Sequence, residues 1–195
     1  ADSDHAVSGL LERAASAPNM ARALLNVARN RGAAGVDGRS VDEVMEASPS
    51  LLPKLQSELL AGTYDPGDIR RVWIPKPSGQ GQRGLGIPNV VDRWVRQCAL
   101  QVLEPIFEPT FHPSSHGFRP NRGAHTAIAE AAGYVGDGFD WVIDIDLSKF
   151  FDRVNHQRLL SRLGQRVQDG RILKLAHRML KAKVVFPDGT RVSTT

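Results

Sequence analysis

The sequence is short of the features that mark disulfide-rich, secreted or membrane proteins. Its 195 residues include one cysteine, Cys98, which excludes an intrachain disulfide. No apolar run approaches the roughly 18 to 20 residues that cross a bilayer, and no charged-then-apolar N-terminus resembles a signal peptide. At 41% hydrophobic residues, the chain is long enough to bury one good core or two small ones. We therefore expect a soluble, cytoplasmic globular protein without a membrane partner, with Cys98 in the core.

The net charge of +4 is small but unevenly placed along the chain. Residues 1–68 carry six basic and ten acidic side chains, whereas residues 69–125 carry eight basic and three acidic ones. Seven of those eight cations are arginines, whose planar guanidinium suits two-point contacts with phosphate. The middle of the chain is therefore a candidate polyanion-binding surface, with a merely solvated basic face as the alternative.

Helical patterns occupy the first third of the chain. Pro18 fits the first turn of a helix that ends before Gly32, and a further helix is expected from about Leu51 to Leu60. Between them lies a glycine-rich loop, 32–38, followed by a capping box at Ser40–Glu43. The loop lacks the lysine and the strand-loop-helix setting of a P-loop. A structural turn and a phosphate contact both remain open.

The pattern of apolar residues changes from helical to alternating near residue 69. This pattern predicts a β-hairpin with strands at Ile69–Ile74 and Arg83–Ile87. Lys76 and Arg83 flank the hairpin tip, where two cations could neutralise a triphosphate. A helix is expected next, from Asn89 to about Leu103, broken at Glu104–Pro105.

The segment 111–122 mixes aromatic, hydroxyl and arginine side chains, a mixture that can grip a nucleic-acid backbone. Phe111 and Phe118 are each better interpreted singly as core residues. The three histidines His112, His116 and His125 have no Cys or Glu at zinc spacing, so no zinc site is assigned.

The most specific pattern is the apolar run 141–147, which contains Asp144 and Asp146 two residues apart. Its Val, Ile and Leu residues predict a buried strand from which both aspartates project on one face. Buried carboxylates are costly without a cation or another compensating group. A magnesium pair meets that need. Capping of the following turn, or pairing with Lys149 and Arg153, is an equally good interpretation of the two residues alone.

Four blocks in order resemble the early sequence blocks of bacterial group II intron reverse transcriptases. They are Asn30-Arg31-Gly32-Ala33-Ala34-Gly35-Val36-Asp37-Gly38, Arg71-Val72-Trp73-Ile74-Pro75-Lys76-Pro77 with Arg83-Gly84-Leu85-Gly86-Ile87-Pro88, Ser115-His116-Gly117-Phe118-Arg119-Pro120, and the aspartate segment with Phe150-Phe151-Asp152. The last block is similar to polymerase motif A. The resemblance implies an α+β fold, that of a right-hand polymerase: fingers made of helices and a β-hairpin, and the beginning of the palm sheet.

The resemblance also implies roles for individual residues. Asp146 would be the catalytic ligand of two Mg²⁺ ions, aided by the Leu147 backbone carbonyl and by Asp144 as a supporting acid. The residues implied for nucleotide binding are Lys76, Arg83, Lys149, Phe150 and Phe151, and Phe151 would exclude a ribose 2′ hydroxyl. The residues implied for template or RNA contact are Arg70, Arg71, Ile87, Pro88, Arg119 and Arg122. Gly84 departs from the family, which usually has proline there, so a looser hairpin arm is expected.

The expected domain organisation is an N-terminal helical extension with fingers helices (1–68), the fingers hairpin and helices (69–135), and a partial palm (136–195). The later aromatic-x-Asp-Asp motif does not occur in the sequence, so we expect this chain alone to be inactive. The expected partners are an RNA template, a DNA primer, a dNTP and structured intron RNA. A non-catalytic RNA-binding or maturase module is the alternative. Pairing of two copies through an open palm surface is compatible with the sequence, although no residue pattern indicates it.

Overall fold

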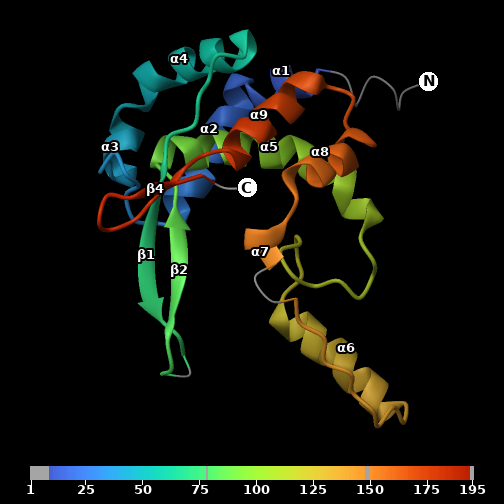
Figure 1. Cartoon of the computed structure of the whole chain (residues 1–195). Coiled ribbons are helices and arrows are strands. Elements are labelled where there is room, and N and C mark those ends of the chain that lie inside the picture. The colour runs from blue at the N-terminus through green and yellow to red at the C-terminus, as the bar shows by residue number, and fades with distance from the viewer. Residues whose placement is uncertain (1–8, 78, 148–149, 194–195) are drawn as a thin grey trace, which may run out of the picture.

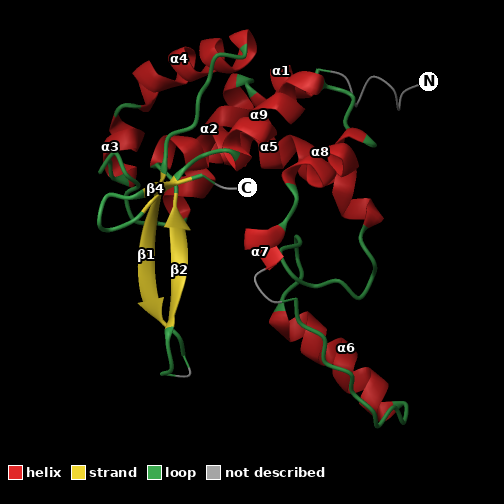
Figure 2. Ribbon diagram, viewed as in Figure 1, coloured by secondary structure: helices red, strands yellow, loops and turns green. Residues whose placement is uncertain are grey.

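The computed structural model describes residues 9–77, 79–147 and 150–193. Helices predominate, and one small sheet carries a long hairpin (Figures 1 and 2). In chain order the elements are α1 (Leu10–Ala14), α2 (Ala17–Arg29), α3 (Val41–Glu46), α4 (Ser48–Ala61), β1 (Ile69–Pro75), β2 (Gln82–Ile87), α5 (Val90–Phe107), a 3-10 turn (Glu108–Thr110), α6 (Ala124–Gly136), α7 (Phe150–Arg153), α8 (His156–Gly164), α9 (Gly170–Leu180), β3 (Val184–Val185) and β4 (Arg191–Val192). The α+β class is therefore confirmed.

The local signals at the helix ends act as the sequence predicts. Ser40 and Glu43 form a reciprocal capping box at the start of α3, and Gly62 ends α4 in the left-handed conformation at φ 67°. The helix α5 differs from expectation, because it continues past Pro105 to Phe107. Proline lacks an N–H and so removes one hydrogen bond near the end of the helix. Val102, Ile106 and Phe107 offset that loss by packing in an apolar cluster with α1.

The main core forms around α5. Trp94, Val95 and Cys98 are buried against α2, and the cluster extends to α3, α4 and Leu175 of α9. The Trp94 indole N–H donates to the Met20 carbonyl at 2.8 Å, which joins α5 to α2. Cys98 is buried as expected, and burial raises the pKa of its thiol to about 12.

The sheet has the strand order β2-β1-β3-β4. The pair β1–β2 is antiparallel, β3 lies parallel to the start of β1, and β3–β4 form a short antiparallel pair. The predicted hairpin at Ile69–Ile87 is thus confirmed. A turn between β3 and β4 places Gly189 at φ 84°.

The expected buried strand at 142–147 is wrong in this structure. Residues 141–147 have no regular secondary structure, and Trp141, Ile143 and Ile145 are 94%, 85% and 81% exposed. A strand forms only where neighbouring strands accept its backbone hydrogen bonds. The sheet of the described residues does not include this segment. Figure 1 shows α6 and the chain that follows it extending away from the helices around α5.

None of the helices that the structure describes combines the length and the hydropathy of a membrane span.

Candidate nucleotide and nucleic-acid interface

The hairpin register gathers several predicted contact residues on one face. Arg70 pairs with Ile87, and Ile74 pairs with Arg83. Directly paired residues project to the same side of a sheet, and sides alternate along each strand. Arg70, Arg83 and Ile87 therefore share one face, which is otherwise made of Val72, Ile74 and Leu85.

Lys76 lies at the hairpin tip, directly after β1. Its backbone N–H donates to the Gly81 carbonyl at 3.1 Å, and its carbonyl accepts from Gly79 N–H at 2.9 Å. The Lys76 and Arg83 side chains are both exposed. The two cations thus stand free of the core on the two arms of one tight turn.

Arg71 lies on the opposite face from Arg70. Its guanidinium carbon is 5.9 Å from the Trp73 ring centroid and 5.8 Å from that of Phe186. A Cβ at Gly84 would lie 2.6 Å from Arg71 Nη1, so glycine leaves the room that this guanidinium occupies. The structure therefore separates Arg71 from Arg70, Arg83 and Ile87. Its role in template binding stays a prediction.

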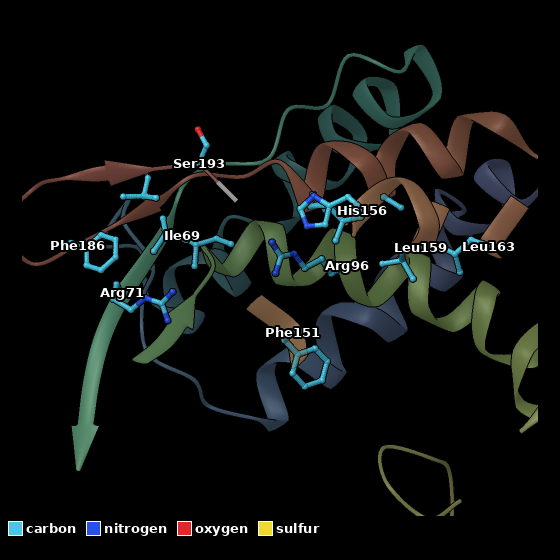
Figure 3. A pocket seen from close by; sticks show the side chains of 14 residues that line it. Ile69, Arg71, Arg96, Phe151, His156, Leu159, Leu163, Phe186 and Ser193 are labelled. Carbon is cyan, nitrogen blue, oxygen red and sulfur yellow. The ribbon is translucent and has the colours of Figure 1, made fainter. Parts of the chain in front are cut away.

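A large cavity opens on the Arg71 side of the sheet. It has a volume of about 600 Å³ and is walled by apolar residues of α8, α9 and the sheet. Arg71, Arg96, His156 and Phe151 also line it (Figure 3). Burial lowers the pKa of Arg96, and the Asp92 charge opposes that shift. Among the described residues, no acceptor partners Nε of Arg71 or of Arg96. Neither Arg96 nor His156 lies in one of the four sequence blocks, so no motif indicated them.

Arg119 is held by protein acceptors on all three of its nitrogens. Nε and Nη2 donate to the Glu108 carboxylate at 3.0 and 2.7 Å, and Nη1 donates to the His112 and Ser115 carbonyls at 2.8 and 2.9 Å. The Arg119 side chain is only 8% exposed, and its hydrogen bonds lower the pKa of Glu108. These contacts brace the segment 108–119. A template contact by Arg119 remains a prediction.

The neighbouring polar residues hold the same segment against α6. Arg122 Nη1 donates to the Pro113 carbonyl. His116 Nε2 lies 2.8 Å from Glu130 Oε2. Hydrogen bonds from Ser114, His116 and Tyr134 lower the pKa of Glu130 to about 2. These bonds tie the segment around His116 to α6 through Glu130.

Phe111 and Phe118 are not core residues, contrary to the sequence-based interpretation. Phe118 is fully exposed with φ 55°, and Phe111 is about half exposed. The buried side chain of this loop is Arg119 instead, and the two aromatic rings face outward. Phe111 lies 5.4 Å from the Arg119 guanidinium carbon, which gives that ring a partner without burying it.

The proposed metal ligands lie in the exposed segment 141–147. Asp144, Asp146 and Leu147 are all exposed there. Within the described ranges, no three His, Cys, Asp or Glu side chains are grouped as metal ligands. Lys149 lies outside the described residues. Phe150 and Phe151 begin α7 with their rings 5.4 Å apart, and only Phe151 lines the cavity.

Comparison with known proteins identifies the family. Residues 74–193 match the reverse transcriptase (RNA-dependent DNA polymerase) family. Protein YkfC of Escherichia coli (strain K12) is 39% identical over 152 residues, which are 76% of this chain and 40% of that protein. Group II intron-encoded protein LtrA of Lactococcus lactis subsp. cremoris is 33% identical over 157 residues, 80% of this chain and 26% of LtrA. The chain thus spans less than half the length of these relatives.

A solved structure supports the fold assignment. A chain of the partial Cas6-RT-Cas1--Cas2 complex superposes with a TM-score of 0.58 over 94% of this chain and 30% of that one. At 16% sequence identity, this likeness concerns the fold alone. The family match over 74–193 and the intron-encoded relatives together establish that this chain belongs to the reverse transcriptases of group II intron type.

Proposed function

We propose that this chain supplies the fingers and the beginning of the palm of an RNA-directed DNA polymerase. Nucleotidyl transfer would add dNTPs to a DNA primer along an RNA template. The observation that carries the proposal is the hairpin geometry: Lys76 and Arg83 are exposed on the two arms of one tight turn, and Arg70 and Ile87 share the Arg83 face. Cations placed in this way can neutralise a triphosphate while the apolar strand face contacts the template base.

Asp146 and the Leu147 carbonyl would hold Mg²⁺ with Asp144 as a supporting acid. Such oxygen ligands suit Mg²⁺, which binds through one or two carboxylates together with waters and substrate phosphates. Mg²⁺ held by these oxygens would supply Lewis-acid activation of the attacking 3′ oxygen and neutralisation of charge on the triphosphate. Phe151 would pack beneath the incoming sugar and exclude a ribose 2′ hydroxyl.

A direct test measures dNTP binding by the purified chain with Mg²⁺ and an RNA–DNA template–primer. Lys76→Ala and Arg83→Ala should each weaken dNTP binding while template–primer affinity stays nearly intact. Lys54→Ala is the matched control, because it removes an exposed positive charge from α4. The Lys54 ammonium lies 3.9 Å from the Glu58 carboxylate. If both hairpin variants bind dNTP with wild-type affinity, Lys76 and Arg83 do not belong to the nucleotide site.

We also propose that the 195 residues alone do not synthesise DNA, because the described residues group no third carboxylate with Asp144 and Asp146. Incubation with Mg²⁺, template–primer and dNTPs should give no primer extension. Robust extension would refute this account of the catalytic set.

The alternative function is a non-catalytic RNA-binding or maturase module acting on structured intron RNA. The basic segment 69–125 favours it as strongly as it favours template binding. Measured dNTP affinity separates the two functions. If the chain binds RNA but not dNTP, and Lys76→Ala leaves RNA binding unchanged, the RNA-binding module is favoured.

Pairing with a second copy is a further proposed interaction. The segment 124–147 contains five acidic residues and no lysine or arginine, and much of its apolar surface is exposed. The cavity beside α8 and α9 offers the complementary surface, apolar with Arg71 and Arg96. Light scattering of the purified chain should detect a dimer that Ile143→Asp dissociates. A monomer at all accessible concentrations would exclude the pairing.

A further inference from the structure

Three separate segments meet at the start of α5. They are the glycine-rich loop 32–38, the segment 63–68 that leads into β1, and the exit from β2 at Ile87–Pro88. Asn89 and Asp92 lie one helical turn apart at this meeting point, so their side chains project from the same face of the helix.

Asn89 holds the glycine-rich loop. Its Oδ1 accepts the Asp37 backbone N–H at 3.2 Å. A Cβ at Gly35 would lie 2.3 Å from Asn89 Oδ1 and 2.6 Å from the Asn89 backbone nitrogen and Cα. Backbone atoms cannot move aside as a flexible side chain can, so only glycine permits this approach. Arg93 adds a second bond one turn on, from Nη2 to the Ala33 carbonyl at 2.6 Å.

Asp92 holds the segment that enters β1. It is 3% exposed and accepts the Tyr64 hydroxyl at 2.5 Å and the Gly67 N–H at 3.2 Å from each carboxylate oxygen. Burial and the Asp92 charge raise the pKa of Tyr64, which keeps the hydroxyl protonated as a donor. Arg178 of α9 donates to the Tyr64 carbonyl at 2.7 Å.

The two residues also meet at Gly67. A Cβ there would lie 2.3 Å from Asn89 Nδ2 and 3.2 Å from Asp92 Oδ2. Gly67 is two residues before β1, and Asn89 is two residues after β2. The roots of both hairpin strands are therefore fixed against the same helical turn.

We propose that Asn89 and Asp92 are positioning residues that couple the glycine-rich loop to the fingers hairpin. The loop 32–38 then acts as a strut against the hairpin root rather than as a phosphate-binding loop of its own. Through this coupling, Asn89 sets the orientation of the hairpin face that carries Arg70, Arg83 and Ile87. This last step rests on the proposed function, whereas the coupling itself does not.

Amide hydrogen exchange of the purified chain tests the coupling. Asn89→Ala should speed exchange at Asp37 and across 33–38, and also across 65–71, by roughly three- to tenfold, the equivalent of one neutral hydrogen bond. Asn89→Asp keeps an acceptor for the Asp37 N–H and should restore protection of the loop. Asn26→Ala is the matched control, because it removes an amide that donates to Gln101 between α2 and α5. Exchange that changes in the loop alone, with 65–71 unaffected, would overturn the coupling.

Gly35→Ala tests the same contact from the loop side, which keeps the proposal testable if Asn89→Ala does not fold. The added methyl group should loosen 33–38 and 65–71 together. Gly133→Ala is the control, because a Cβ at that position in α6 meets nothing within 4 Å. Unchanged exchange in Gly35→Ala would contradict the close approach and with it the proposal.

Salt-dependent RNA binding distinguishes positioning from direct contact. Asn89→Ala should raise the Kd for single-stranded RNA several-fold with the slope of log K against log salt unchanged, since no cation is lost. Arg70→Ala, which removes a cation of the predicted template contact, should lower that slope by about 0.7. A Kd that stays at the wild-type value in Asn89→Ala would overturn the positioning role. If Arg70→Ala also left RNA binding unchanged, the proposed template contact of the hairpin would fail, while the exchange result would still decide the coupling.

Discussion

Gly84 and Arg71 should be energetically coupled, and a double-mutant cycle measures that coupling. A Cβ at Gly84 would lie 2.6 Å from Arg71 Nη1, 3.0 Å from Arg71 Cδ and 3.1 Å from Trp73 Cζ3. The φ of Gly84 is not in the left-handed region, so alanine is conformationally acceptable there. The main cost of Gly84→Ala is therefore the displacement of the Arg71 guanidinium from its place near Trp73 and Phe186, since Trp73 has to shift by only a few tenths of an ångström.

The magnitude follows from two opposing effects. Cation–π contacts at partly exposed sites contribute about 0.5–1 kcal/mol each, and Arg71 has two rings within 6 Å. Replacing glycine by alanine at a compatible position stabilises by about 0.4–1 kcal/mol through the unfolded state. In the wild-type background we expect Gly84→Ala to be neutral or destabilising by up to about 1 kcal/mol. In the Arg71→Ala background the same change should become stabilising.

Urea unfolding of the four proteins gives the coupling energy, which should be about 1 kcal/mol. Equal effects of Gly84→Ala in the two backgrounds would refute the reasoning, since the alanine would then not be competing with Arg71. The result also bears on the hairpin arm. A looser arm was expected where the family has proline, whereas the structure fills the space at Gly84 with the Arg71 side chain.

Three further outcomes can be measured directly. Cys98 should not react with a thiol reagent at pH 8 in the native protein and should react once in denaturant, because burial raises its pKa to about 12; full labelling of the folded chain would contradict its burial. For Asp169, burial acts to raise the pKa, but hydrogen bonds from the Leu11 N–H and from Arg171 outweigh it, so the pKa lies below its usual range. A carboxyl group whose pKa is lowered by folding stabilises the fold above its unfolded pKa of about 3.9, and that contribution is lost as pH falls. Asp169→Asn should therefore destabilise the protein near pH 7, and the difference in unfolding midpoint from the wild type should shrink below about pH 4. A difference that does not depend on pH would show that the charge of Asp169 does not stabilise the fold. Arg119→Lys keeps the charge but loses the planar fork, so it should lower the thermal midpoint and leave the salt slope of RNA binding unchanged; a normal midpoint with weaker RNA binding would favour a template contact instead.

Most of the secondary structure could be predicted from local signals in the sequence. The capping box at Ser40, the glycine beyond α4 and the turn residues between β1 and β2 act within a few residues, so their effect can be predicted from sequence alone. The hairpin prediction placed Lys76 and Arg83 correctly at its tip. Arg70 and Arg71 were both expected to contact template because the family resemblance implies it. Side chains alternate between the two faces of a strand, so the neighbouring residues Arg70 and Arg71 lie on opposite faces.

Longer-range features could not be predicted in this way. Asn89 contacts Asp37 across 52 positions, and Arg178 reaches the Tyr64 carbonyl across 114. Nothing in the local pattern pairs these residues. Phe118 was expected in the core because it is aromatic, but it faces solvent while Arg119 takes the buried place beside Glu108. Hydrophobicity is a weaker guide in a loop, where one braced side chain can decide which way its neighbours point.

The cost of burying a carboxylate applies to Asp92 in this structure and not to Asp144 and Asp146. In the segment 141–147 it predicted compensated acids on a buried strand, whereas Asp144 and Asp146 are exposed and need no compensation from the protein. Asp92 is the acid to which the argument applies. It lies within the apolar helical pattern between Val91 and Val95, is 3% exposed, and receives donors from Tyr64 and Gly67. An acid inside an otherwise apolar helix face requires such partners wherever they come from, so the same reasoning applied to α5 indicates a site that fixes the hairpin root.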